Sequence, residues 1–358
     1  MSIKFNYTNG TKAHAKPIID FLSRLFPGLN QELWDWEYKN APCNSSIITA
    51  EHNGCLIGHY ACINYEFVIS GSVVSGGKAE GSLVNLRKVA VLPKEVSKGI
   101  FTRLVKKLLK NKSDENYDII FGFSNSLALP GQIEAGFKLI EIPMRSAILI
   151  RDLSSFVQPS NQLSNFLLLI INRFLSVIQF ALRIDFIERK FEIVNLTDIN
   201  PEEVDSFASE YNLNYPEQNT IHRDAKFYSW RFINNPYCTS TVLVVKNSRG
   251  KIEGVSALCQ KKENMGTIQI QDLIATNQRA IRALLKAAID FANLQRANSL
   301  EIWSGKSLAH QAVNTQLKRL GFMFGKQQRK KMIVWSENYQ SNVTDPYSWY
   351  VTMAFRRH

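Results

Sequence analysis

The sequence is poor in cysteine and has no disulfide or zinc-binding motif. Five cysteines are scattered along 358 residues without a C-x-x-C pair, so a disulfide framework is excluded and a zinc site is not expected. The first ten residues, MSIKFNYTNG, lack the apolar core of a signal peptide. We therefore expect a protein of the reducing cytoplasm that binds no metal.

The motifs of three common enzyme classes are also missing. The sequence contains no G-x-x-x-x-G-K-[ST] loop and no G-x-G-x-x-G loop, which argues against a nucleotide hydrolase and against a dinucleotide-dependent enzyme. It contains no G-x-S-x-G elbow, and no cysteine has the local sequence of a catalytic nucleophile. Covalent catalysis by a serine or a cysteine is therefore disfavoured.

The chain has no long uninterrupted apolar run. Residues 163–182 read LSNFLLLIINRFLSVIQFAL, but Asn172, Arg173 and Gln179 interrupt the apolar residues. A membrane-spanning helix needs about 20 mostly apolar residues, and an arginine in mid-span costs several kcal/mol. We expect this segment to form a buried or interdomain helix, with peripheral membrane contact as the alternative.

What the sequence does have is the composition of a two-domain globular protein. It is 45% hydrophobic and 21% charged, and its length suits two domains of roughly 100–200 residues each. The 43 lysines and arginines outnumber the 31 acidic residues, and the resulting net charge of +12 favours an anionic partner. Nucleic acid, a membrane surface and a phosphate-bearing small molecule all satisfy that requirement.

The two halves of the chain repeat each other. Residues 36–42 read WEYKNAP and residues 230–236 read WRFINNP, which match at a Trp, an aromatic residue, an Asn and a Pro. In both halves an apolar strand, a turn with Asn and Gly and a second strand follow, as in a β-hairpin. Each half also has a later Gly-Phe pair, Gly136-Phe137 and Gly321-Phe322. Three matches in the same order predict two homologous domains in tandem.

Hydrophobic periodicity predicts alternating strands and helices in each half. The first half is expected to contain strands over 2–7, 82–92, 117–123 and 137–151, a hairpin over 46–70, and helices over 13–25, 30–39, 98–111 and 126–135. The second half repeats this order from about residue 190. The expected fold class is α/β (α+β), with one domain over 1–151, a connector with the apolar helix over 152–189 and a second domain over 190–358.

Residues 89–109, VAVLPKEVSKGIFTRLVKKLL, predict an anion site. A β-branched strand at Val89–Leu92 leads through a polar loop to Gly99 and an amphipathic helix with a basic face. The first-turn N–H groups of such a helix point outward, and its dipole favours negative charge. Ser97 and Lys98 add a hydroxyl and a cation, and Gly99 lets a phosphate approach the backbone.

This segment resembles the pyrophosphate loop of the GNAT superfamily of acyl-CoA-dependent N-acyltransferases, R/Q-x-x-G-x-G/A. The aligned residues are Val96-Ser97-Lys98-Gly99-Ile100-Phe101. Only the central glycine is kept, because Val96 replaces Arg or Gln and Phe101 replaces Gly or Ala. These departures motivate one alternative, a non-catalytic acyl-CoA-binding module whose cofactor loop has decayed.

Residues 121–141 resemble the second cofactor motif of the same superfamily, in which a strand ends near an asparagine, here Asn125, before a helix and a Gly-Phe pair. The Trp-x-Tyr-x-Asn-x-Pro motif is similar to that of tandem GNAT proteins of surface-polysaccharide biosynthesis. The resemblance implies two tandem GNAT-like domains, each with a mixed, mostly antiparallel central sheet flanked by helices. The second copy has no glycine between Gly266 and Gly305, so we expect it to form the wall of the acceptor-substrate site rather than to bind cofactor.

The resemblance also implies the chemistry, because in this superfamily an amine attacks the thioester of an acyl-CoA held between two central strands. An oxyanion donor is expected among the backbone N–H groups around Val89–Val91. Glu80, just upstream of the expected cofactor strand, is the first candidate base and His59 is the second, while Tyr60 and Glu134 stay open. The expected cofactor-binding residues are Val89, Val91, Ser97, Lys98, Gly99, Ile100, Phe101, Thr102 and Asn125.

The resemblance to polysaccharide-biosynthesis proteins implies a nucleotide-linked amino sugar as acceptor, of the kind used for O-antigen. Acetyl-CoA or a short hydroxyacyl-CoA would be the donor, and both substrates are polyanions that suit a basic protein. The other alternative is an aminoacyl-tRNA-dependent peptidyltransferase, which the basic charge favours and the absence of a long charged helical arm disfavours. Nucleic acid is therefore the weaker partner, and the oligomeric state stays open.

Overall fold

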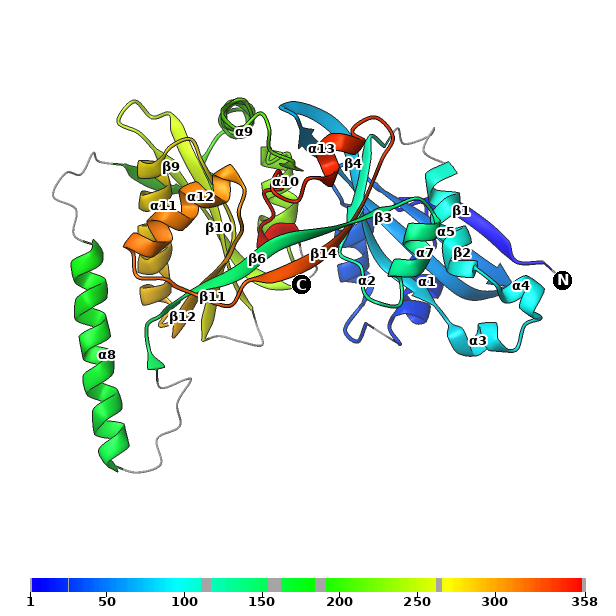
Figure 1. Ribbon diagram of the computed structural model, residues 1–358, viewed down its shortest axis with the longest axis horizontal. Coiled ribbons are helices and arrows are strands. Elements are labelled where there is room, and N and C mark those ends of the chain that lie inside the picture. Colours follow the sequence, from blue (N-terminus) through cyan, green and yellow to red (C-terminus); the bar gives the residue numbers. More distant parts are fainter. Residues whose placement is uncertain are drawn as a thin grey trace. The chain divides into compact units, whose positions relative to one another are not determined.

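Strands and helices follow the chain in the same order twice in this computed structural model (Figure 1). The structure describes residues 2–24, 26–110, 117–153, 162–183, 191–261 and 266–355. The chain forms two units, each assembled from more than one segment. The first unit comprises Met1–Ile142, Asn219–His222 and Lys330–Trp349, and the second comprises Pro143–Gln218, Arg223–Arg329 and Tyr350–His358.

The first unit is a mixed sheet with helices on it. Its elements are β1 (Lys4–Asn9), α1 (Ala15–Leu22), α2 (Gln31–Trp34), the π-helix η1 (Asp35–Lys39), β2 (Ser45–His52), β3 (Cys55–Ile69), β4 (Ser72–Val84), α3 (Leu86–Ala90), α4 (Lys94–Ser97), α5 (Ile100–Lys110), β5 (Ile119–Gly122), α7 (Leu129–Glu134), β8 (Thr220–Ile221), α13 (Gln340–Thr344) and most of β14 (Gln328–Ser336). The strand order is β1-β2-β3-β4-β5-β14, and β8 pairs with β3. Only the β4–β5 pair of this path is parallel.

The second unit repeats this arrangement. Its elements are most of β6 (Lys138–Ile150), α8 (Gln162–Arg183), β7 (Glu192–Asn195), η3 (Leu196–Asp198), α9 (Pro201–Asn214), α10 (Ala225–Tyr228), the π-helix η4 (Ser229–Ile233), β9 (Cys238–Lys246), β10 (Ile252–Lys261), β11 (Thr267–Ala275), α11 (Gln278–Leu294), β12 (Ser299–Ser304), α12 (Leu308–Arg319), β13 (Met323–Phe324) and η5 (Met353–Phe355). The strand order is β6-β12-β11-β10-β9-β7, with β13 on β6 and a parallel β11–β12 pair. The predicted fold class, two mixed and mostly antiparallel sheets flanked by helices, is confirmed.

The repeated Trp-x-aromatic-x-Asn motif forms the same unusual structure in both units. The motif lies on η1 in the first unit and on η4 in the second, and both are single π-helical turns. The Asn40 N–H donates to the Asp35 carbonyl at 2.7 Å, and the Asn234 N–H donates to the Ser229 carbonyl at 2.8 Å. Because π-helical turns are rare, their recurrence at matching positions confirms that the sequence repeat is a structural one.

The two Gly-Phe pairs also have one structure. Each glycine lies just past a helix in the left-handed region, with φ of 110° at Gly136 and 81° at Gly321. The following N–H reaches back to the last turn, from Phe137 to the Gln132 carbonyl at 3.1 Å and from Phe322 to the Leu317 carbonyl at 3.0 Å. This is the glycine-ended helix terminus that left-handed backbone permits, so both pairs end a helix and lead into a strand as predicted.

Each sheet packs against a helix at a glycine, and the two glycines occupy matching positions in the sequence repeat. The first core lies between the sheet and α5, where Ile100, Leu104, Val105 and Leu108 are buried. A Cβ on Gly58 would lie 2.9 Å from Leu104 Cδ1, and a Cβ on Gly254 would lie 2.8 Å from Leu284 Cδ1 on α11. The matching contacts identify α5 and α11 as equivalent helices, and they confirm the predicted apolar face of residues 98–111.

The two units do not coincide with the two halves of the sequence, because each half gives a strand to the other. Arg145–Ile150 of β6 pair with β12 of the second unit, and Ile333–Ser336 of β14 pair with β5 of the first. The first unit therefore ends at Ile142 and takes residues 330–349 from the far end of the chain, where the sequence suggested one domain over 1–151. Side-chain alternation specifies a strand but not the sheet that it joins.

The predicted strand over 82–92 is wrong. The strand in this region is β4 (Ser72–Val84), and Leu86–Ala90 form the short helix α3, which Asn85 caps by accepting from the Lys88 N–H at 3.1 Å. Val89 and Val91 therefore do not lie on a strand. β4 contains Gly76, Gly77 and Gly81, which weaken the strand signal in the sequence. Pairing with β3 on one side and β5 on the other specifies it instead.

Residues 162–183 of the expected connector form the long helix α8 (Figure 1). The helix confirms the secondary structure predicted for the apolar segment, but the expected burial is wrong, because Leu163, Phe166 and Phe174 are 67%, 61% and 64% exposed. Residues 154–161 and 184–190 on either side lie outside the described part of the chain. Within the described residues, no helix is long and apolar enough to cross a membrane.

Candidate active site

The first unit contains two parallel strands that run together only over part of their length. β5 pairs with β4 from Gly76–Ile119 to Lys78–Phe121 and ends at Gly122. β4 continues to Val84, paired with β3 on its other side. After Lys78, β4 no longer pairs with β5. A ligand that approaches this end of the sheet can therefore reach backbone groups of β4 on that side.

A glycine bulge interrupts β4 at the same place. His59 lies opposite Leu83 and Ala61 lies opposite Glu80, so β4 has one extra residue in between. Gly81 in this bulge has a φ of 59°, and a Cβ there would lie 2.4 Å from the Tyr38 hydroxyl oxygen. Both the left-handed backbone and the close hydroxyl require glycine.

His59 holds this bulge. Its Nδ1 lies 2.7 Å from the Gly81 carbonyl oxygen, and its ring lies 6.3 Å from the rings of Trp34 and Tyr38, measured between centroids. The side chain is fully buried. A base must reach the proton that it removes, and in this structure His59 contacts the protein interior. We therefore propose a positioning role for His59, whose part in catalysis stays a prediction from the sequence.

Glu80, the first candidate base, forms an ion pair with Lys78. Ala79 packs into the core beside α5, so Lys78 and Glu80 point to the other face of the sheet. The Glu80 side chain is 16% exposed and that of Lys78 is 5% exposed. The carboxylate therefore has both a neutralising cation and some access to solvent. The ion pair of Lys78 with Glu80 was not predicted, because a lysine that follows two glycines matches no known sequence motif.

The start of α5 is preceded by an exposed glycine. Gly99 precedes the helix with a φ of 68° and is exposed, and a Cβ there would have no atom within 4 Å. The first-turn N–H groups of an α-helix have no acceptor within the helix. Ser97 and the exposed Lys98 lie directly before Gly99. The Arg103 guanidinium holds the loop by donating from Nη2 to the Val96 carbonyl at 2.5 Å.

Phe101, which departs from the family loop, turns toward the protein interior. Its ring meets that of Tyr60 edge-on at 5.8 Å between centroids. It also packs against Gly131 of α7, where a Cβ would lie 2.5 Å from the Phe101 ring. The glycine on α7 therefore accommodates the large residue on α5. Thr102 is also buried and donates from Oγ1 to Glu134 Oε2 at 3.2 Å.

Behind the start of α5 lies a polar chain that the sequence did not reveal. Ser124 donates from Oγ to Gln132 Oε1 at 2.5 Å, and Gln132 donates from Nε2 to the Tyr60 hydroxyl at 3.4 Å. Burial raises the pKa of Tyr60, so its hydroxyl stays protonated. The three residues come from the loop after β5, from α7 and from β3, and their contacts depend on tertiary folding. The sequence had singled out Tyr60 alone of the three, as an open candidate for the base.

The remaining predicted residues are dispersed. Asn125 Oδ1 accepts from the Leu127 N–H at 3.0 Å and from the Ala128 N–H at 2.8 Å, and so it orders the turn before α7. Val89 lies on α3, and Val91 just after it is 83% exposed. The structure thus places Ser97, Lys98, Gly99, Ile100, Phe101 and Thr102 together at one helix start, and it removes Val89 and Val91 from the expected strand.

The equivalent helix start in the second unit is closed by its own side chain. When Leu104 and Leu284 are matched, Gly99 of α5 corresponds to Arg279 of α11. Asn277 Oδ1 accepts from the Arg279 N–H at 3.0 Å and from the Ala280 N–H at 2.9 Å. The groups that would bind an anion already have an acceptor.

A carboxylate recurs at the equivalent strand position. Ala61 lies opposite Glu80 in the first unit, and Ala257, the matching hairpin residue, lies opposite Asp272 on β11 in the second. The Asp272 side chain is fully buried. Its Oδ2 accepts from Arg223 Nε at 2.8 Å and from the Tyr228 hydroxyl at 2.9 Å, while Oδ1 accepts from Thr352 Oγ1 at 2.8 Å.

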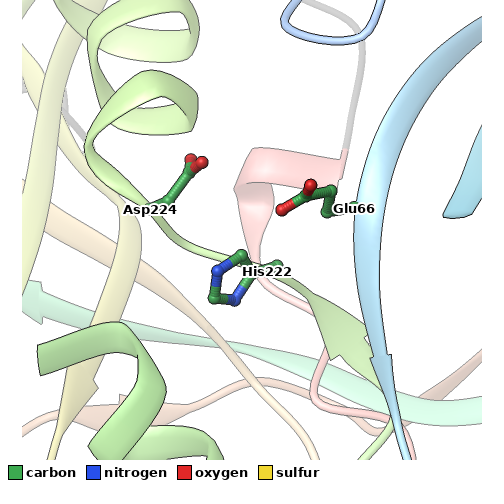
Figure 2. Close-up of side chains that lie close together, drawn as sticks. All are labelled: Glu66, His222 and Asp224. Carbon is green, nitrogen blue, oxygen red and sulfur yellow. The ribbon is translucent and has the colours of Figure 1, made fainter. Parts of the chain in front are cut away.

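Figure 2 shows Glu66, His222 and Asp224, three side chains of types that bind metal ions. Glu66 and His222 belong to the first unit, where the His222 N–H donates to the Glu66 carbonyl at 2.8 Å. Asp224 belongs to the second unit and caps α10 by accepting from the Phe227 N–H at 2.7 Å. We assign no metal site to these residues.

Residues 6–135 match the family described as an acetyltransferase (GNAT) domain. The matched range contains β4, the Gly99 turn, α5, β5 and α7. The fold is that of the GNAT acetyltransferases. No curated protein matches the sequence.

Solved structures with the GNAT fold resemble the chain over nearly its whole length. A probable N-acyltransferase from Enterococcus faecalis V583 has a TM-score of 0.65 at 10% identity, covering 94% of this chain and 73% of that one. A tandem GNAT protein from the clavulanic acid biosynthesis pathway has a TM-score of 0.51 at 10% identity, covering 94% and 98%. Saccharomyces cerevisiae N-myristoyltransferase with bound myristoyl-CoA has a TM-score of 0.53 at 9% identity, covering 92% and 82%.

Proposed function

We propose that this protein is an acyl-CoA-dependent N-acyltransferase and that its first unit holds the acyl-CoA. The observation that carries the proposal is the exposed, glycine-led start of α5, where Phe101 contacts Tyr60 on β3 opposite the bulge of β4. The similarity to N-myristoyltransferase, whose structure contains an acyl-CoA, supports the choice of ligand.

The CoA phosphates would lie at the start of α5. The residues there fit an anion, because the first-turn N–H groups and the helix dipole both favour negative charge. Lys98 adds a cation, Ser97 adds a hydroxyl, and Gly99 leaves the backbone uncovered. The inward orientation of Phe101 keeps its ring away from this backbone and supports a functional loop over a decayed one.

The reaction would be a direct transfer. The amine nitrogen attacks the thioester carbonyl carbon, the new C–N bond forms, the C–S bond breaks, and CoA leaves as a thiol after it takes up a proton. A backbone N–H of β4 beyond Lys78 is our candidate oxyanion donor in place of Val89–Val91. Glu80 is our candidate base, since its carboxylate retains access to solvent.

For the acceptor we propose the amine of a nucleotide-linked amino sugar. The net charge of +12 suits a nucleotide diphosphate as well as CoA. The second unit, whose helix start is closed by Asn277, would contribute to acceptor binding and leave the acyl-CoA to the first. The donor would be acetyl-CoA or a short hydroxyacyl-CoA.

The acyl-CoA site is tested by calorimetric titration of acetyl-CoA into two matched variants. Gly99→Leu and Gly250→Leu both place a side chain at a left-handed position, with φ of 68° and 77°, and both have open space around the new Cβ. Both variants should lose similar stability from backbone strain. Only Gly99→Leu should weaken acetyl-CoA binding, by roughly 30-fold or more because phosphate contacts to the backbone are lost. Equal affinity in the two variants would refute the site.

The reaction is tested by measuring release of free CoA thiol. A panel of acyl-CoAs is mixed with amino sugars, nucleotide-linked amino sugars and simple amines in the presence of the protein. Release that requires a nucleotide-linked amino sugar supports the acceptor. Release with other amines supports the transferase and overturns the acceptor. Tight acetyl-CoA binding without release from any amine would instead favour the binding module, and salt-sensitive binding of aminoacyl-tRNA would favour the peptidyltransferase.

A further inference from the structure

Helix α8 of the second unit exposes a continuous apolar face. Its large apolar side chains recur every three or four residues, the spacing that puts them on one side of an α-helix. Their exposed fractions are 67% for Leu163, 61% for Phe166, 51% for Leu167, 47% for Ile170, 45% for Ile171, 64% for Phe174 and 65% for Val177. Contiguous apolar surfaces larger than a few hundred Å² mark interaction sites on soluble proteins.

The opposite side of α8 contacts Asp152 and Leu153 of the preceding segment. Ser164, Leu168 and Asn172 are spaced four residues apart and are each half-buried. Asn172 donates from Nδ2 to Asp152 Oδ1 at 2.6 Å and accepts at Oδ1 from the Leu153 N–H at 3.0 Å. These bonds orient the helix about its axis, so that the apolar face defined above points away from the segment that holds it.

The charged residues within α8 have one sign, and the nearby Asp152 lies on the opposite side of the helix, against Asn172. Arg173 is exposed beside the apolar face, and no acidic residue occurs between Gln162 and Arg183. The whole protein carries a net charge of +12. An apolar helix face with a cation at its border suits a helix that lies in the headgroup region of a membrane, and positive charge adds attraction to anionic lipids.

We propose that α8 binds the protein to the surface of a membrane rich in anionic lipids. The helix would lie in the plane of the surface, with the apolar face among the acyl-chain ends and Arg173 at the phosphates. This orientation agrees with the finding that no described helix can cross a membrane. The proposal concerns the second unit alone and does not depend on the acyl transfer proposed for the first.

A second copy of the chain would cover the apolar face less well. Two copies that each carry +12 repel one another, whereas an anionic surface attracts both. The face from Leu163 to Val177 also contains no polar residue that would set the register of a helix pair, as specific helix pairs usually require. A fluid bilayer imposes no register.

The proposal is tested by flotation of the full-length protein with lipid vesicles. One set contains phosphatidylcholine with one quarter phosphatidylglycerol, and the other contains phosphatidylcholine alone. Phe174→Glu changes the centre of the apolar face, and Leu169→Glu makes the same kind of change on the polar side, where Leu169 is 58% exposed. Phe174→Glu should lower the partition coefficient at least about tenfold, and Leu169→Glu less than about threefold. Circular dichroism checks that both variants are folded.

A second measurement excludes effects of charge alone. In Phe174→Trp, emission should shift to shorter wavelength when anionic vesicles are added, and lipids brominated in the acyl chain should quench it, because the ring enters the apolar layer. Failure of the unmodified protein to float with either vesicle, or equal losses in the two glutamate variants, would overturn the proposal. So would a concentration-dependent dimer in sedimentation velocity that Phe174→Glu abolishes, since that result assigns the face to a second copy.

Discussion

The starts of α5 and α11 occupy equivalent places in two copies of one fold, yet they differ in the groups that face their first-turn N–H groups. At α5 the backbone passes through Gly99 in open space, with Ser97 and Lys98 beside it. At α11 an arginine takes the place of the glycine, and Asn277 accepts from two first-turn N–H groups. A capping side chain stabilises a helix by satisfying the donors that an anion would otherwise use. We propose that the first copy keeps its donors for a ligand, whereas the second uses them for stability.

The equivalent carboxylates on β4 and β11 differ in the same way. Glu80 has Lys78 as its partner and some exposure to solvent. Asp272 is enclosed, and it accepts hydrogen bonds from Arg223, Tyr228 and Thr352. The pKa of Arg223, which burial alone would lower, is raised by the charge of Asp272. A carboxylate that is fully enclosed stabilises the fold, while one that is partly open can exchange protons with a substrate.

The largest effect is expected from Asp272→Asn. The substitution keeps the shape of the side chain but leaves the Arg223 charge buried without its counter-ion, which should lower the free energy of unfolding by about 3–5 kcal/mol. Urea unfolding measures this loss. The control Glu210→Gln breaks the exposed Lys251–Glu210 pair, whose side chains are 60% and 38% exposed, and should cost no more than about 1 kcal/mol. Similar losses in both variants would contradict the structural role of Asp272.

Acid should also act on the interior of the second unit. Burial lowers the pKa of His310 from its ordinary 6.5 to about 4 in the folded protein. The imidazole donates from Nε2 to the Val351 carbonyl at 3.0 Å, and its Nδ1 lies 2.8 Å from Ser307 Oγ. The unfolded chain takes up the proton more readily than the folded protein. The free energy of unfolding should therefore decrease by about 3 kcal/mol as the pH falls from 6.5 toward 4.

The test is urea unfolding of the wild-type protein and of His310→Gln at several pH values between 7 and 4. The glutamine variant should be less stable at pH 7, since it loses a fitted ring, but its stability should fall less steeply with pH. Only the slopes are compared. Parallel curves would show that His310 does not titrate as its burial requires.

The next largest effect is expected on the rate of CoA release when Glu80 is replaced. Glu80→Gln should lower the rate of CoA release about 100-fold, equivalent to about 2.7 kcal/mol, because the amide cannot accept the amine proton. Acetyl-CoA affinity should stay unchanged, since Glu80 is not among the residues at the start of α5. Glu66→Gln on β3, an exposed carboxylate, is the matched control and should keep full activity. An unchanged rate in Glu80→Gln would exclude it as the base.

Local signals in the sequence predicted the parts of this fold that short segments specify. The hairpin turn at Asn53-Gly54, both Gly-Phe helix ends and the amphipathic helix after Gly99 follow from backbone freedom and side-chain spacing, and the structure contains all of them. The π-helical turns at η1 and η4 were visible as a repeat, although not as π-helices.

Features that depend on tertiary contacts were not predictable from the sequence. β4 is a strand because β3 and β5 flank it, although its glycines weaken the local signal. The exchange of β6 and β14 between the two sheets leaves no trace in either strand's own residues. His59 was a candidate base as a residue type, and only its distance of 2.7 Å from the Gly81 carbonyl oxygen reveals that it holds the bulge.

The smallest expected effect tests whether free helix donors are sufficient for acyl-CoA binding. Asn277→Ala removes the acceptor from the Arg279 and Ala280 N–H groups and should cost about 1 kcal/mol of stability, as should the control Asn200→Ala at the start of α9. Titration of Asn277→Ala with acetyl-CoA should still give one site per chain, because the second unit has Arg279 in place of the glycine that leaves the backbone uncovered in the first. Two sites per chain would mean that the cap alone closes the second unit, and that the glycine is dispensable.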